Sequence, residues 1–154
     1  MRTLPVAALV SLLLTVPLHA DEEGGDDVLQ KAVNYMFTGK VDPTEVPQIV
    51  DRKTCIVVVP DPAYRRYARY YLSRFRVDDS SIGKKYSGPR VLYELDVAST
   101  DDILVEYLSL DKATVIQGYK SAQIPLPGNF EQTRRALQLI FGEYCKPEKT
   151  SNPF

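Results

Sequence analysis

Residues 91–108, VLYELDVASTDDILVEYL, decide the fold that the sequence predicts. Apolar and polar residues alternate on both sides of a polar centre, which is the pattern of two β-strands joined by a turn. If the strands pair about Thr100, Leu95 lies opposite Val105 and one face of the pair is continuously apolar. The stretch therefore predicts an antiparallel hairpin.

Further strands are expected on both sides of this hairpin. Residues 54–59 are a β-branched run that ends at Pro60-Asp61-Pro62, which is typical of a buried strand. Residues 113–124 place apolar groups on both faces of a third meander strand. Residues 64–77 fit both a helix and a strand. Their aromatic content and the preceding Pro-Asp-Pro favour a strand over residues 69–77, and the helix remains the alternative.

Two amphipathic helices flank the strands. Residues 28–37 carry apolar groups at helical spacing and Gly39 ends the run, while Asn129 is the expected N-cap of a helix over residues 130–144. The order of elements predicts an α+β domain. It has an N-terminal helix, an antiparallel β-meander of about four to five strands and a C-terminal amphipathic helix packed on the sheet.

The N-terminus has the order of a secretory signal peptide: Arg2, an apolar run and the cleavage site Leu18-His19-Ala20. The run is too short for a membrane anchor, and no integral membrane segment is expected in the mature chain. The protein is therefore expected in the periplasm or outside the cell. The predicted organisation is a signal peptide over residues 1–20, a flexible acidic start over 21–27, a single α+β domain over 28–147 and a disordered tail over 148–154.

The net charge and the histidine content exclude several classes of function. Cleavage removes one of 19 basic residues and none of the 20 acidic ones, so the mature net charge is about −2 and no DNA partner is expected. The single histidine, His19, lies in the predicted leader. Histidine-dependent catalysis and histidine metal sites are excluded from the mature chain, and neither a metal nor a cofactor is expected.

The two cysteines, Cys55 and Cys145, are expected to form a disulfide because an oxidising compartment favours their pairing. The alternative is two separately buried thiols. Closing a loop of about 90 residues stabilises a fold by on the order of 4 kcal/mol in the chain-entropy model.

Four stretches carry a resemblance to a known family: YYLSRF at 70–75, YELDV at 93–97, KSAQIPLPG at 120–128 and YCKP at 144–147. They resemble an uncharacterised family of small exported proteins of rhizobia and related alphaproteobacteria. The resemblance implies a Gram-negative periplasmic or secreted location. It implies no activity and assigns a role to no residue.

Three carboxylates form one candidate site. In the predicted hairpin Glu94 lies opposite Glu106 and Asp96 shares their face, an arrangement of the type used in glycoside hydrolysis. The alternative is a polar patch whose charge is neutralised by a nearby lysine or arginine.

An arginine- and tyrosine-rich segment forms the other candidate site. Residues 64–76 contain five arginines and four tyrosines, which combine guanidinium forks with flat rings. The predicted binding residues are Arg65, Arg66, Tyr67, Arg69, Tyr70, Arg74 and Arg76. The expected partner is an anionic glycan or lipid head group of the cell envelope, and the alternative is a solvated basic face with its tyrosines packed on the core.

These observations favour a small periplasmic or secreted non-enzymatic binding or structural domain that recognises an anionic envelope component. The competing function is a histidine-free hydrolase that uses Glu94 and Glu106.

Overall fold

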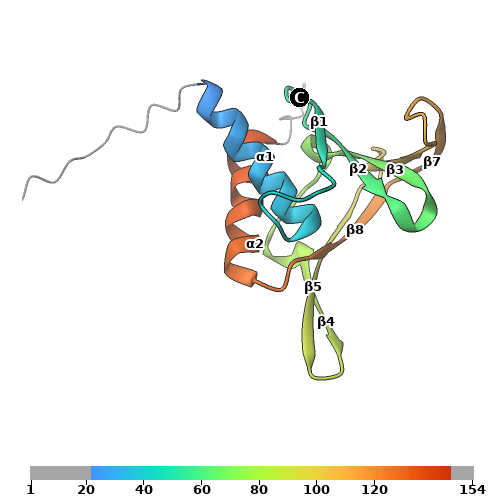
Figure 1. The fold of residues 1–154 in the computed structure, drawn as a ribbon. Coiled ribbons are helices and arrows are strands. Elements are labelled where there is room, and N and C mark those ends of the chain that lie inside the picture. The colour runs from blue at the N-terminus through green and yellow to red at the C-terminus, as the bar shows by residue number, and fades with distance from the viewer. Residues whose placement is uncertain (1–21, 147–154) are drawn as a thin grey trace, which may run out of the picture.

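The computed structural model of the protein describes residues 22–146, in which two antiparallel sheets carry two helical elements along one side (Figure 1). The α+β class, the antiparallel strands and the C-terminal helix are as predicted. The predicted signal peptide, residues 1–20, and the predicted tail, residues 148–154, lie outside the described residues.

The larger sheet contains five strands in the order β1, β2, β3, β6, β7, and every neighbouring pair is antiparallel. The strand bounds are Gln48–Asp51 for β1, Ile56–Asp61 for β2, Arg66–Tyr71 for β3, Val105–Leu108 for β6 and Val115–Tyr119 for β7. The buried run predicted at residues 54–59 corresponds to β2, in which Val57 and Val58 are buried.

The strand predicted over residues 69–77 exists as β3, but it begins and ends earlier. A 3-10 turn at Pro62–Tyr64 precedes it, and Arg65 adopts a left-handed conformation with φ of 50°, so the chain enters the strand at Arg66. A second 3-10 turn, Leu72–Arg74, ends the strand and buries Leu72. The helical alternative is wrong for this segment.

The smaller sheet shows that the predicted hairpin about Thr100 is wrong. Its strands are β4 (Ile82–Ser87), β5 (Arg90–Ala98) and β8 (Ser121–Leu126), in the order β4, β5, β8. β5 pairs with β4 and β8, whereas β6 pairs with β3 and β7. Leu95 accordingly lies opposite Ile82 and Ile124 rather than opposite Val105.

The physical reason is that alternation identifies a strand without identifying its partner. The Ser99 hydroxyl oxygen accepts from the N–H groups of Asp101 and Asp102, at 3.3 and 3.0 Å, and this bend leads the chain away from β5. The hairpin that does form turns at Gly88, where φ is 60° and glycine avoids the strain that a Cβ would bring.

The stretch predicted as one strand over residues 113–124 divides into β7 and β8, which belong to different sheets. Lys120 separates them, and its carbonyl oxygen accepts from the Ser99 N–H at 2.7 Å. The chain therefore passes between the sheets three times, through residues 72–81, through residues 99–104 and at Lys120. The two sheets meet beside the last two crossings.

Two helices, α1 and α2, lie side by side along one side of the molecule (Figure 1). Their bounds are Glu22–Thr38 for α1 and Phe130–Leu137 for α2, which continues as a π-helical stretch, Gln138–Tyr144. The Asn129 side chain accepts from the Gln132 N–H at 3.2 Å, so the predicted N-cap is present. Residues 22–27, for which the composition predicts a flexible start, belong to α1.

The main core draws on both helices and both sheets. Phe75 is fully buried and stacks on Phe141, with ring centroids 5.9 Å apart. Other buried members are Val33, Met36, Val57, Leu72, Leu95, Leu104 and Ile140. Because the helices cover only one side, strand β7 at the far edge of the larger sheet is exposed along its whole length.

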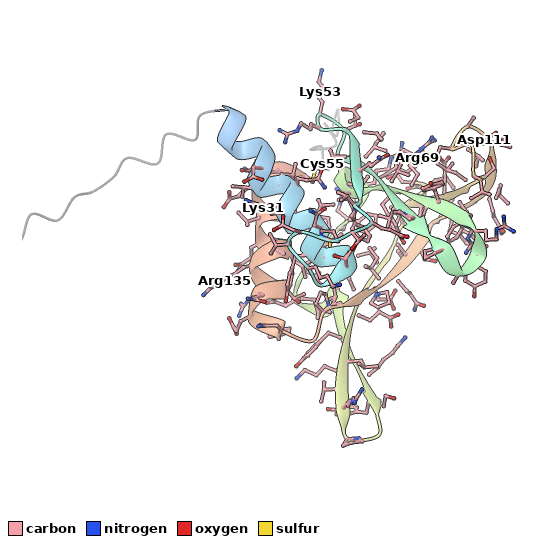
Figure 2. All side chains as sticks on the ribbon, viewed as in Figure 1. Lys31, Lys53, Cys55, Arg69, Asp111 and Arg135 are labelled. Atoms are coloured by element: carbon pink, nitrogen blue, oxygen red, sulfur yellow. A yellow bond between two sulfur atoms is a disulfide. The ribbon has the colours of Figure 1, made fainter. Side chains whose placement is uncertain are left out.

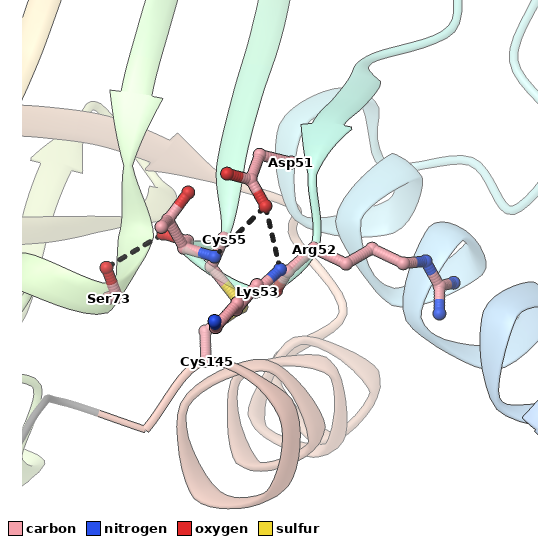
Figure 3. Close-up of a disulfide and its surroundings, with 7 residues drawn as sticks. Asp51, Arg52, Lys53, Cys55, Ser73 and Cys145 are labelled. Carbon is pink, nitrogen blue, oxygen red and sulfur yellow. Dashed lines mark hydrogen bonds between the residues drawn. A yellow bond between two sulfur atoms is a disulfide. The ribbon is translucent and has the colours of Figure 1, made fainter.

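The predicted disulfide between Cys55 and Cys145 is present, with Cα atoms 5.6 Å apart and a sequence separation of 90 (Figure 3). It ties the residue before β2 to the end of the C-terminal helix. The surrounding turn is held by the Asp51 carboxylate, which accepts from the Lys53 N–H at 2.9 Å. The Ser73 hydroxyl adds a bond to the carbonyl oxygen of Thr54 at 2.8 Å.

Candidate binding cleft between the two sheets

The arginine- and tyrosine-rich segment does not form a single surface, because it becomes a strand. Successive side chains of a strand point to opposite faces. In β3 the residues on the face toward the core are Arg66, Ala68 and Tyr70, and those on the outer face are Tyr67, Arg69 and Tyr71. The predicted binding residues are therefore divided between two faces of the larger sheet.

On the outer face, Glu106 accepts hydrogen bonds from the polar side chains of β3. Its Oε2 atom accepts from Arg69 Nη1 at 3.1 Å and from the Tyr71 hydroxyl at 2.6 Å. Burial and the bond to Glu106 raise the pKa of Tyr71. Arg74 lies over the Tyr71 ring, 4.2 Å from its centroid, and donates to the carbonyl oxygen of Ile103 at 2.8 Å. Glu106 thus neutralises Arg69, whereas Arg74 is held by a ring and a backbone carbonyl.

The remaining predicted binding residues are also separated. Arg65 and Arg76 are exposed, and neither makes an ion pair within the described part of the chain. Tyr67 carries Lys112 over its ring, 4.5 Å from the centroid, beside a shallow depression of about 370 Å³. Figure 2 shows Arg69 on the part of the larger sheet that lies away from the helices.

The predicted carboxylate pair does not form, because its hairpin does not form. Glu94 lies in the smaller sheet and pairs with Lys85, while Glu106 lies in the larger sheet with Arg69. Asp96 lies opposite Gln123 of β8. The two glutamates each hold a cation in separate sheets, which leaves no carboxylate pair of the predicted kind.

A cleft of about 500 Å³ lies where the two sheets meet. The larger sheet contributes Arg66 and Tyr70 from β3, Val105 and Tyr107 from β6, and Tyr119 from β7. The smaller sheet contributes Asp96 from β5 and Ser121, Ala122 and Gln123 from β8. The volume falls within the usual range for small-ligand sites.

Aromatic rings form one wall of the cleft. Tyr107 and Tyr119 meet edge to face, with centroids 5.6 Å apart and planes 82° apart. The Arg66 guanidinium lies 3.5 Å from the Tyr107 centroid and is held there by the Asp61 carboxylate, which accepts from its Nε atom at 2.9 Å. The rings and the guanidinium plane are thus fixed before any ligand arrives.

The polar groups around these rings form no hydrogen bonds with the described part of the protein. Within residues 22–146 no hydrogen bond engages the hydroxyls of Tyr70, Tyr107 and Tyr119 or the side chains of Asp96, Ser121 and Gln123. Burial raises the pKa of Tyr70 well above its usual value, so its hydroxyl stays protonated and able to donate even at alkaline pH. The cleft therefore offers donors and acceptors that the fold itself does not use.

The charge of the cleft is small. Arg66 is matched by Asp61, with both side chains about three-quarters buried, and Asp96 stands on the opposite wall. A strongly basic surface of the kind predicted for an anionic partner is not assembled here. Flat rings and unpaired neutral groups dominate instead, a combination that suits a ligand with hydroxyl groups and apolar C–H faces.

A second hollow, of about 560 Å³, lies between α2 and the base of the β4–β5 hairpin. Its walls are mostly apolar and include Tyr93, Phe130 and Phe141. The Asp78 carboxylate at its rim accepts from the N–H groups of Ser80 and Ser81, and these bonds hold the pKa of Asp78 below its usual value. This carboxylate caps a 3-10 turn, so its bonding capacity is used by the fold.

Sequence reasoning missed both the cleft and the β4–β5 hairpin. The hairpin had a local signal, the Gly88-Pro89 dipeptide between two stretches able to form strands. The cleft had none, since its walls are brought together by the pairing of β3 with β6 and of β5 with β8, strands that are distant in sequence.

Comparisons with known proteins add no relative: the chain matches no protein family, no curated protein and no solved structure. Residues 22–146 hold no group of three or more histidine, cysteine, aspartate or glutamate side chains that could bind a metal ion. None of the helices in that range combines the length and apolar character that crossing a bilayer requires.

Proposed function

We propose that this protein is an exported, non-enzymatic binding domain that takes a saccharide of the cell envelope in the cleft between its two sheets. The observation that carries the proposal is the set of unpaired polar side chains gathered around the Tyr107 and Tyr119 rings. Sugars present apolar C–H faces that pack on such rings, and hydroxyls that need both donors and acceptors.

The distribution of charge decides between saccharide classes. Arg66 supplies one guanidinium to the cleft, but Asp61 already pairs with it and Asp96 faces it. An acidic sugar would gain from Arg66 and lose from Asp96. We therefore expect neutral and acidic oligosaccharides to bind with similar affinity, in place of the strong anion preference that the sequence predicts.

Binding without hydrolysis follows from the carboxylates of the cleft. Glycoside hydrolysis commonly needs two carboxyl groups, one on each side of the scissile bond. The described lining holds one, Asp96, because Glu94 and Glu106 each hold a cation elsewhere. Export is supported by the predicted leader and by the disulfide, since disulfides persist in oxidising compartments.

The test is binding to a soluble library of neutral, N-acetylated and acidic oligosaccharides, measured by calorimetry. The Tyr119→Ala variant removes a ring that is 38% exposed and should weaken binding about thirtyfold, the effect of losing an aromatic hot spot. Tyr119→Phe keeps the ring and removes only the hydroxyl, and should weaken binding less than Tyr119→Ala does.

The matched control is Tyr86→Ala, which removes an exposed tyrosine remote from the cleft lining and should leave affinity unchanged. The proposal fails if no member of the library binds. It also fails if Tyr119→Ala and Tyr86→Ala bind the same sugar as tightly as the unmodified protein does.

A further inference from the structure

The β4–β5 hairpin extends away from the rest of the protein, and its turn projects beyond both the helices and the other strands (Figure 1). The two strands pair from Ile82 and Leu95 at the base to Ser87 and Arg90 at the turn. A two-residue turn with glycine in a positive-φ conformation closes the end tightly. The tip is thus a preformed finger rather than a loose loop.

The finger exposes apolar side chains on both of its faces. Tyr86 is 74% exposed and Leu92 is 48% exposed, and Val91 is exposed beside Tyr86. Alternation places Tyr86 and Val91 on one face and Leu92 on the other. An apolar tip open on both faces fits a partner that can surround it.

The outer part of the finger carries only positive charges. Residues 80–93 contain Lys84, Lys85 and Arg90 and no acidic residue. Lys85 pairs with Glu94 at the base, whereas Lys84 and Arg90 make no ion pair within the described chain. Lysines on an edge strand commonly prevent strand-to-strand aggregation. That role does not account for Tyr86, Val91 and Leu92, since exposed apolar groups on an edge favour association.

We propose that the tip of this hairpin is a contact site for a membrane surface that contains anionic lipid. Leucine and valine enter the boundary between head groups and acyl chains, and tyrosine sits at the head-group level. The flanking cations attract the anionic head groups, and lipid covers both faces of the finger at once. A protein partner would cover one face and leave the other apolar face in water. The site is independent of the saccharide cleft, whose lining shares no residue with it.

The experiment uses vesicles of phosphatidylglycerol and phosphatidylcholine in equal amounts, with pure phosphatidylcholine vesicles as reference. The mature N-terminus is verified by mass, because an uncleaved apolar leader would itself bind lipid. The protein should sediment with the anionic vesicles and release as salt rises. The triple variant Lys84→Gln/Lys85→Gln/Arg90→Gln should bind at least about tenfold more weakly.

Two further variants separate a specific finger from general charge attraction. The control Lys40→Gln/Lys53→Gln/Arg135→Gln removes the same charge from the body of the protein, where Figure 2 places Lys53 and Arg135, and should bind like the unmodified protein. Tyr86→Trp introduces the only tryptophan of the chain, and its emission should shift to the blue and be quenched by brominated lipid.

The proposal is overturned if the anionic vesicles do not bind the protein, or if both triple variants lose the same affinity. It is equally overturned if the indole emission of the Tyr86→Trp protein is unchanged when vesicles bind, which would place the contact elsewhere.

Discussion

In the helix-covered half of the protein, the Tyr35 hydroxyl donates to Gln132 at 2.9 Å and joins α1 to α2. At the cleft, the hydroxyls of Tyr107 and Tyr119 have no partner anywhere in residues 22–146. A tyrosine hydroxyl thus stabilises the fold in one region, whereas in the other region the tyrosine hydroxyls form no hydrogen bond with the protein. A paired group must break a bond before it can hold a ligand, whereas an unpaired group exchanges only water. The comparison separates a region that stabilises the fold from a region available for binding.

The disulfide is the strongest test of the stabilising region. The double variant Cys55→Ala/Cys145→Ala should lower the free energy of unfolding by about 4 kcal/mol, because a loop of about 90 residues regains its freedom in the unfolded chain. Denaturant unfolding of the oxidised protein and the double variant measures the difference. A change below about 1 kcal/mol would show that the cross-link contributes little.

A core truncation tests whether stability resides mainly under the helices. Leu72 is fully buried, so Leu72→Ala should lower the free energy of unfolding by about 3 kcal/mol. Tyr119→Ala in the cleft should lower it by less than about 1 kcal/mol, because the ring is partly exposed and its hydroxyl is unpaired. Equal losses in the two variants would abolish the distinction between the regions.

On the outer face of the larger sheet, we expect a loss of stability between that of the core variant and that of the cleft variant. Glu106→Gln leaves Arg69 without its counter-charge in a mostly buried site and should lower the free energy of unfolding by about 1 to 2 kcal/mol. Saccharide binding should be unchanged, because Glu106 lies on the opposite face of the sheet from the cleft. A Glu106→Gln protein that folds normally but no longer binds would mean that this face, and not the cleft, holds the ligand.

The smallest expected effect is on how the free energy of unfolding depends on alkaline pH. Burial raises the pKa of Tyr70 above 10.0, so the folded protein keeps this phenol protonated while the unfolded chain ionises. The contribution of Tyr70 to the free energy of unfolding is fully present below pH 10 and is lost as the pH rises further. Tyr70→Phe should therefore weaken the decline in unfolding free energy between pH 9 and 11, and Tyr71 should account for part of what remains. An identical decline in both proteins would contradict the buried position of this hydroxyl.

The sequence predicted local features correctly and failed where strands pair over long distances in the sequence. The disulfide and the Asn129 cap were predictable because each depends on few residues with one dominant chemistry. The pairing of β5 was not, since Leu95 can lie as well against Ile82 and Ile124 as against Val105. Local composition therefore predicted strands but assigned one of them to the wrong partner.

The candidate site was harder to predict for a related reason. The density of arginine and tyrosine in residues 64–76 drew attention to β3, but strand alternation places Arg69 and Tyr71 on the face away from the cleft. The rest of the cleft comes from β5, β6, β7 and β8, which meet only after both sheets have formed. A pattern within one short segment contains no information about such a meeting.

The central claim, that the unpaired groups of the cleft form a saccharide site, is tested most directly by mapping the contact. Two-dimensional amide spectra of the ¹⁵N-labelled protein, recorded while the tightest-binding oligosaccharide is added, report which residues change environment. We expect the largest shifts on residues 105–107, 119 and 121–123 and no shifts in the helices. Shifts confined to the hollow beside α2, or to the outer face around Glu106, would contradict it.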